Sequence, residues 1–197
     1  MKHRLVLVIS LAGLVLASGT ATASGTASAA PAHAQRAASQ PQNCVAEAEP
    51  AGSTVTPTVT CYSSFAASIA AATGGRVRLP ASTKPSSITR AEISAWNAVP
   101  ATVFVLSIDW KDVNFSGPSL AWTQSADCGS FQAAGMPSGW NDVVSSVVTS
   151  ADCANSLFQN SNFGGSRLDI SKNTSRATLG SFNDLTSSEK WCTSKPC

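Results

Sequence analysis

Short stretches of alternating hydrophobic and polar residues dominate the chain from residue 101 to residue 197. Leu120 and Trp122 are one such pair, and Gly, Ser, Asn and Asp interrupt the stretches every few positions. A period of two places every second side chain on one face of a strand, which buries that face in a core. We therefore predict a mainly β domain over residues 101–197, with Trp110, Trp140 and Trp191 in its core beside Trp122.

Residues 44–100 have a mixed pattern that predicts a small α/β appendage. Residues 44–61 are typical of a hairpin, because residues 50–53 carry turn chemistry and residues 54–60 are rich in β-branched side chains. A short strand is expected at residues 76–79.

Two helices are expected within this appendage. Ser63 or Ser64 can cap the first, and Gly74 follows its last apolar residue. Thr89 and Glu92 form a capping box that begins the second, which should end before the proline at position 100.

The N-terminus has the pattern of a secretory signal peptide. Lys2 and Arg4 precede an apolar run at residues 5–17, and small residues follow it. We predict a signal peptide over residues 1–34, cleaved after about residue 29 or 34, and a disordered linker over residues 35–43. The expected protein is secreted into the extracellular space.

Charge and histidine content exclude several functions. The formal charge of +2 comes from the two basic residues of the signal segment, so the mature chain is neutral. Binding to nucleic acid or to an anionic membrane needs many uncompensated Lys and Arg residues. Both histidines, His3 and His33, also lie in the signal segment, which excludes a Ser-His-Asp triad or a His-bearing zinc site. We expect no catalytic activity and a monomer.

Six cysteines lie beyond the signal segment, an even number that predicts a disulfide framework in a secreted protein. No short C-x-x-C spacing favours a metal cluster. Proximity along the chain suggests the pairs Cys44–Cys61, Cys128–Cys153 and Cys192–Cys197.

An internal repeat is present within the β domain. Residues 110–120 align with residues 158–168, and in each copy an aromatic residue is followed seven positions later by glycine, with Asn-Phe between them. The glycine allows a positive φ in a folded hairpin that the phenylalanine can cover. The two copies predict two four-stranded units in a two-sheet Greek-key sandwich, with a short insertion near Cys128 in the first.

Each repeat continues to an Asn-Asp-x-x-Ser-Ser loop, at residues 141–146 and 183–188. One such loop is most simply explained as turn chemistry, since Asx and Ser side chains bond to nearby backbone. Two of them supply amide, carboxylate and hydroxyl oxygens, the ligands that suit Ca²⁺. Duplication therefore favours a cation site.

At these residues the chain resembles the βγ-crystallin family. The hairpin signature of that family, an aromatic residue, six residues, Gly, any residue and Ser or Thr, is matched by Trp110, Gly117 and Ser119. The second copy departs from it with Arg167, and both loops match the family's Ca²⁺ consensus. The resemblance covers about residues 103–192 and implies a two-loop Ca²⁺ clamp.

The resemblance also implies a set of calcium ligands. They are the carboxylates of Asp142 and Asp184, the carbonyls of Val143 and Leu185 and the hydroxyls of Ser145 and Ser187, with Asn141 and Asn183 as ligands or loop-shaping groups. Carbonyls near Lys111 or Asp112 and near Gln159 or Asn160 would complete the sites.

The resulting hypothesis is a secreted, non-catalytic Ca²⁺-binding protein in which the cation stabilises the fold. The alternative is a protease inhibitor, similar to metalloproteinase inhibitors, or a killer-toxin-like protein on the same fold. An inhibitor needs a rigid exposed loop, which the insertion around Cys128 to Pro137 could supply. A cell-wall glycan is a further candidate partner if the tryptophans are exposed.

Overall fold

The structure is a computed structural model that describes residues 42–98 and 101–197. The predicted signal peptide and most of the predicted linker lie outside these residues. The described residues all fall in one compact unit. No helix among them is both long enough and apolar enough to span a bilayer.

The described chain is built mainly of short strands. They are β1 (Asn43–Glu47), β2 (Glu49–Pro50), β3 (Val59–Tyr62), β4 (Phe104–Asp112), β5 (Ser116–Gln124), β6 (Phe131–Ala133), β7 (Ser146–Thr149), β8 (Ala154–Asn160), β9 (Gly164–Ile170), β10 (Ser175–Arg176) and β11 (Ser188–Cys192). The helices are α1 (Phe65–Ala72) and α2 (Arg90–Ala98), with 3₁₀ turns η1 (Pro85–Ser87), η2 (Ser161–Phe163) and η3 (Gly180–Phe182).

The strands form two sheets that pack face to face. One has the order β10-β7-β4-β5-β1-β3 and the other β2-β6-β11-β8-β9. Each repeat keeps three of its strands in one sheet and sends its third strand, β6 or β10, to the other sheet. This exchange ties two Greek-key motifs together and confirms the predicted mainly β, two-sheet sandwich.

The predicted boundary at residue 100 differs from the structure. β1 pairs in parallel with β5 and antiparallel with β3, and β2 pairs with β6, so this region extends both sheets. A separate appendage of this size would have a marginal core, and adding strands to open sheet edges buries more apolar surface. The linker also ends earlier than predicted, because β1 begins at Asn43.

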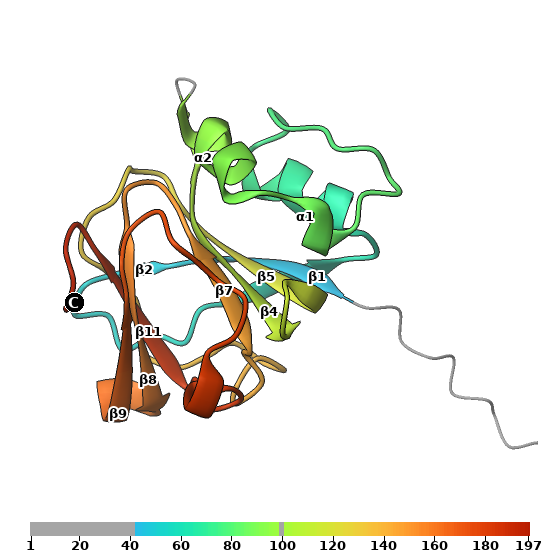
Figure 1. The fold of residues 1–197 in the computed structure, drawn as a ribbon. Helices are drawn as coiled ribbons and strands as arrows, with labels where there is room; N and C mark the ends of the chain where they lie inside the picture. The colour runs from blue at the N-terminus through green and yellow to red at the C-terminus, as the bar shows by residue number, and fades with distance from the viewer. Residues whose placement is uncertain (1–41, 99–100) are drawn as a thin grey trace, which may run out of the picture. The chain divides into compact units, whose positions relative to one another are not determined.

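The two helices lie together over the outer face of the six-stranded sheet (Figure 1). The predicted caps are confirmed: the Ser64 hydroxyl accepts a hydrogen bond from the Ala67 amide, and Thr89 and Glu92 form the capping box. Phe65 and Ile93 of the helices pack there against β4 and β5 in a second hydrophobic core. The strand predicted at residues 76–79 is absent, and this segment is irregular.

The main core lies between the two sheets, with Trp122 and Trp191 at its centre and their ring centroids 4.9 Å apart. All five tryptophans are buried, the most exposed being Trp96 at 8%. The prediction that Trp110, Trp122, Trp140 and Trp191 form core is confirmed, so a tryptophan platform for a glycan is not present on the described surface.

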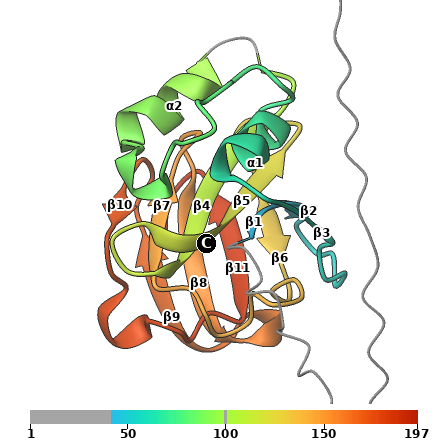
Figure 2. The same ribbon diagram turned by 90° about the vertical axis from the view of Figure 1, so that its right-hand side faces the viewer.

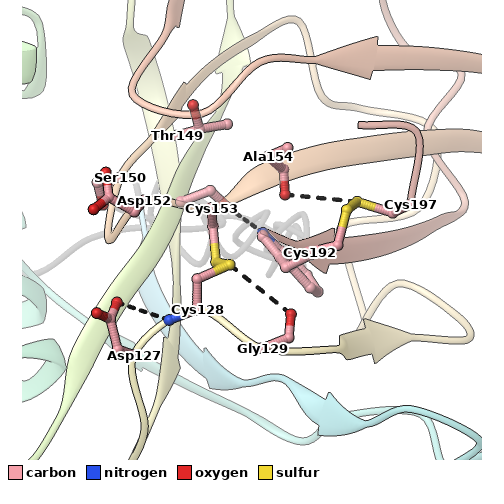
Figure 3. The surroundings of a disulfide bond; sticks show 12 residues. Asp127, Cys128, Gly129, Thr149, Ser150, Asp152, Cys153, Ala154, Cys192 and Cys197 are labelled. Carbon is pink, nitrogen blue, oxygen red and sulfur yellow. Dashed lines mark hydrogen bonds between the residues drawn. A yellow bond between two sulfur atoms is a disulfide. The ribbon is translucent and has the colours of Figure 1, made fainter. Parts of the chain in front are cut away.

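All three predicted disulfides are present. Figure 3 shows Cys128–Cys153, which joins the segment after β5 to the start of β8, and Cys192–Cys197, which holds the C-terminus beside Ala154. Disulfides of this kind are typical of proteins that fold in an oxidising compartment.

The two predicted folded hairpins are nearly identical. Phe115 packs edge-on against Trp110 at 5.4 Å, and Phe163 packs in the same way against Phe158 at 5.6 Å. Gly165 has φ +73°, and a Cβ there would lie 2.9 Å from the Asn160 amide nitrogen. Glycine is therefore required by both conformation and space.

A pair of buried carboxyl groups crosses the main core. Asp109 of β4 and Glu189 of β11 are both 0% exposed and lie close enough for the charge of Asp109 to act on Glu189. The Trp122 indole donates to Asp109 Oδ2 at 2.6 Å, and the Asn155 amide donates to Glu189 Oε2 at 2.8 Å. The remaining oxygens, Asp109 Oδ1 and Glu189 Oε1, are buried and have no hydrogen-bond partner among the described residues. A proton shared between the two carboxyls would satisfy both oxygens.

This pair makes stability depend on pH. Burial raises the pKa of Asp109 to about 7, and burial together with the charge of Asp109 raises the pKa of Glu189 well above its ordinary value. Both pKa values are higher in the folded protein than in the unfolded chain, so the stability they provide is present at low pH and is lost as pH rises through about 7.

We expect the free energy of unfolding to fall between about pH 5 and pH 8, by at most about 1.4 kcal/mol per pH unit for each extra proton that the folded state holds. Urea denaturation across this range measures it. The double variant Asp109→Asn/Glu189→Gln should flatten the profile, whereas Asp127→Asn, at an exposed carboxylate, should not. An unchanged slope in the double variant would contradict the shared proton.

Candidate metal centre

The two Asn-Asp-x-x-Ser-Ser loops lie against each other through reciprocal backbone bonds. The Asp142 amide donates to the Thr186 carbonyl at 3.0 Å, and the Asp184 amide donates to the Val144 carbonyl at 2.9 Å. Both aspartates have left-handed backbone, with φ 53° and 58°. This conformation is uncommon outside glycine but is most accessible to Asp and Asn. The sequence motif therefore folds into two equivalent turns around a local pseudo-twofold axis.

The side chains also cross from one loop to the other. The Ser145 hydroxyl donates to Asp184 Oδ1 at 2.8 Å, and the Ser187 hydroxyl donates to Asp142 Oδ1 at the same distance of 2.8 Å. The two aspartates are exposed, whereas the two serines are 5% and 6% exposed. Each half of the arrangement thus combines a carboxylate from one repeat with a hydroxyl from the other.

The second serine of each loop holds a folded hairpin in place. Ser146 donates to the Asp112 carbonyl at 2.7 Å and accepts from the Phe115 amide at 3.0 Å. Ser188 makes the equivalent bonds to the Asn160 carbonyl at 2.6 Å and from the Phe163 amide at 3.0 Å. No role for these two serines was predicted from the sequence, although their position in both copies of the motif was the available signal.

Each loop bonds to a hairpin strand next to an irregularity in its ladder, through Ser145 N–H to the Trp110 carbonyl and Ser187 N–H to the Phe158 carbonyl. The ladder between β4 and β5 is irregular between Trp110 and Asp112, and the ladder between β8 and β9 is irregular between Phe158 and Asn160. Lys111 and Gln159 are the residues at these irregularities, where a bulge frees backbone groups from pairing. The Asp112 and Asn160 carbonyls already accept serine hydroxyls. Of the predicted alternatives, the geometry favours the carbonyls of Lys111 and Gln159.

The two motif asparagines shape the loops in different ways. Asn183 Oδ1 accepts from the Leu179 amide at 2.8 Å, which commits this oxygen to the turn before the loop. Asn141 donates from its amide nitrogen to Asp142 Oδ2 at 2.6 Å and so orients the carboxylate. Both bonds favour the loop-shaping role that the sequence left open over direct coordination.

The carbonyls of Val143 and Leu185 remain available within the described chain, because the loop-to-loop bonds use the adjacent Val144 and Thr186 carbonyls instead. One carboxylate, one hydroxyl and two carbonyls per half form a set of hard oxygen donors that fits Ca²⁺. No group of three or more His, Cys, Asp or Glu side chains gathers in the described residues, so each half relies on neutral oxygens. Water would complete the six to eight ligands that Ca²⁺ takes.

Two interlocked Greek-key motifs, each with one folded hairpin and one Asn-Asp-x-x-Ser-Ser loop, define a βγ-crystallin-type domain, and the predicted resemblance to the βγ-crystallin family is confirmed. Several solved βγ-crystallin domains resemble the chain. A domain from work on the evolution of the eye-lens βγ-crystallin fold has 27% identity and TM-score 0.38, over 45% of this chain and 85% of that chain.

Two further solved domains give similar values of identity and TM-score. A βγ-crystallin domain from Clostridium beijerinckii has 20% identity and TM-score 0.34, over 45% of this chain and 99% of that chain. The N-terminal domain of protein S has 22% identity and TM-score 0.35, over 47% and 99% of the two chains.

Among protein families, peptidase inhibitor family I36 matches residues 109–168. This segment runs from β4 into β9 and includes the first Asn-Asp-x-x-Ser-Ser loop. A comparison with curated proteins finds no match. Crystallin domains and peptidase inhibitors are both non-catalytic kinds of protein.

We predict that Ser146→Ala and Ser188→Ala each destabilise the fold by about 1–3 kcal/mol, because each leaves a carbonyl and an amide in partly buried surroundings without a partner. Urea denaturation measures the change. Ser116→Ala is the matched control, since its hydroxyl also bonds to a carbonyl but is exposed, and it should cost less than about 0.5 kcal/mol. Equal losses of unfolding free energy in Ser116→Ala and Ser188→Ala would contradict the role of the loop serines.

Proposed function

We propose that this protein is a secreted, non-catalytic Ca²⁺-binding domain in which the cation stabilises the contact between the two repeats. The observation that carries the proposal is the crossed pair of bonds, Ser145 to Asp184 and Ser187 to Asp142. A cation bound by the oxygen atoms of either Asp–Ser pair would contact both repeats at once. Secretion is supported by the three disulfides and by the signal-like N-terminal sequence.

The proposed ligands are Asp184, Ser145 and the Val143 and Lys111 carbonyls in one site, and Asp142, Ser187 and the Leu185 and Gln159 carbonyls in the other. A bound Ca²⁺ supplies charge that the paired carboxylate neutralises, while the serine turns its lone pairs towards the ion. With one carboxylate per site and exposed aspartates, the affinity belongs in the weaker extracellular range.

Calcium titration of the demetallated protein should show binding and a rise in melting temperature. At a hundredfold excess over Kd the stabilisation is about 2.7 kcal/mol. Calorimetry and thermal unfolding measure the two quantities on the same sample.

The variant Asp142→Ala/Asp184→Ala should lose both the binding heat and the rise in melting temperature. Glu47→Ala, which removes an exposed carboxylate from β1, should keep both. Absence of heat and of any change in melting temperature with the natural sequence would remove the calcium proposal.

Peptidase inhibition is a second candidate function, favoured by the match of peptidase inhibitor family I36 to residues 109–168. The two functions are compatible, because a cation that fixes the repeats would also hold a binding loop rigid. The segment that matches the inhibitor family includes both folded hairpins, at residues 110–120 and 158–168.

The inhibitory loop predicted around Cys128 to Pro137 is only partly suited to this role. Residues 132–134 are buried, and β6 pairs with β2 on one side and β11 on the other. The backbone of β6 is therefore already paired on both sides and cannot bond to a peptidase. Within this region Ser130 is exposed, and residues 128, 129, 131 and 135 are partly exposed.

Inhibition should be visible as loss of substrate cleavage when micromolar protein is mixed with elastase, thermolysin or trypsin. Inhibition of at least one of them that follows a defined stoichiometry is the expected result. Full activity of all three at micromolar protein would remove this second candidate and leave the calcium proposal untouched.

A further inference from the structure

We propose that residues 54–56, in the connection between β2 and β3, form the peptidase-binding loop, with the Val55 side chain in the primary pocket of an endopeptidase that accepts small branched apolar residues. The proposal rests on the second candidate function, peptidase inhibition. It places the binding loop outside the segment that the family matches, on a strap of chain that joins the two sheets.

Val55 is the most exposed large hydrophobic side chain in the described chain. It is 59% exposed, and Val113 follows at 40%. Thr54 and Thr56 on either side are exposed as well. An apolar side chain held in water between two hydroxyl-bearing residues gains free energy when a partner buries it.

The local sequence favours an extended backbone here. Residues 54–56 are all β-branched, which restricts their side chains and favours the β region. Pro57 follows, and the residue before a proline is excluded from the helical region. Residues 53–58 accordingly contain no helix or turn.

The N-terminal end of the loop is fixed to the scaffold. The Ser53 amide closes a turn onto the Pro50 carbonyl at 3.1 Å, and the buried Gln132 side chain donates to the Ser53 carbonyl at 2.6 Å. The Ala51 amide donates to the Ser130 carbonyl at 3.0 Å. Three hydrogen bonds therefore fix the position of the chain just before the exposed residues 54–56.

The C-terminal end is fixed as well. Pro57 is buried, and Thr56 packs against Gly135, where an added Cβ would lie 3.3 Å from the Thr56 hydroxyl. The chain then enters β3, which pairs with β1 and carries Cys61 of the disulfide to Cys44. β2 and β3 are edge strands of different sheets, so the strap spans the side of the sandwich, as Figure 2 shows.

This geometry meets the requirements of a substrate-like inhibitor. Endopeptidases bind peptides in an extended form, through main-chain bonds and side-chain pockets. Within the described residues, the only hydrogen bond of Val55 is from its amide to the Ser53 hydroxyl, at 3.3 Å, so its carbonyl is free for a partner. A loop fixed at both ends loses little entropy on binding, which gives affinity without further contacts.

The test uses the full mature chain with elastase, thermolysin and trypsin as the peptidases. We expect the natural sequence to inhibit elastase, which has a small apolar pocket, or thermolysin. Inhibition of thermolysin would identify a metallopeptidase as the partner class. Val55→Asp should weaken that inhibition about 100-fold or more, as for a central contact residue. Val55→Lys should create inhibition of trypsin, whose pocket carries an aspartate.

The matched control is Val113→Asp, at the other exposed valine, which should inhibit as well as the natural sequence. Thermal unfolding of each variant confirms that it is folded, and the gain of trypsin inhibition by Val55→Lys cannot arise from misfolding. Equal inhibition by Val55→Asp and the natural sequence would overturn the loop assignment alone. No inhibition of any of the three enzymes by the natural sequence would overturn peptidase inhibition itself.

Discussion

The reciprocal contact between the two Asn-Asp-x-x-Ser-Ser loops is the constraint on which the rest of the sandwich depends. Each loop supplies an amide and a carboxylate to the other, and its second serine holds the hairpin of its own repeat. Because the third strand of each repeat lies in the sheet of the other, neither repeat can form its sheet alone. The loops therefore fix the register of two motifs that are already interlocked.

In the proposed calcium site, this arrangement would let a cation held by few charges stabilise the fold. The aspartates are exposed and the serines are buried at the base of the loops, so the hydroxyls are placed by the fold and the carboxylates can adjust. A cation bound as proposed would link the repeats at their contact and stabilise the whole domain.

Polar groups also tie the sheets together inside the core. Asp109 and Glu189 link β4 to β11, and the Trp191 indole donates to the Ser107 hydroxyl at 3.0 Å. Buried polar groups of this kind are costly unless fully satisfied, and they then favour one packing over others. The N-terminal strands extend one edge of each sheet and the helices cover one outer face, which leaves the Val55 side chain exposed on the strap between β2 and β3.

The sequence alone was sufficient for the local features. The duplicated hairpins, the paired loops, the helix caps at Ser64 and Thr89 and the three disulfides follow from short-range patterns, because turn chemistry and close cysteine spacing act within a few residues. Only the tertiary structure shows that β1, β2 and β3 belong to the sandwich, that Asp109 meets Glu189, and that each serine meets the aspartate of the other repeat. These contacts join residues far apart in the chain, and strand pairing between sheet edges depends on burial across the whole domain, which no local pattern contains.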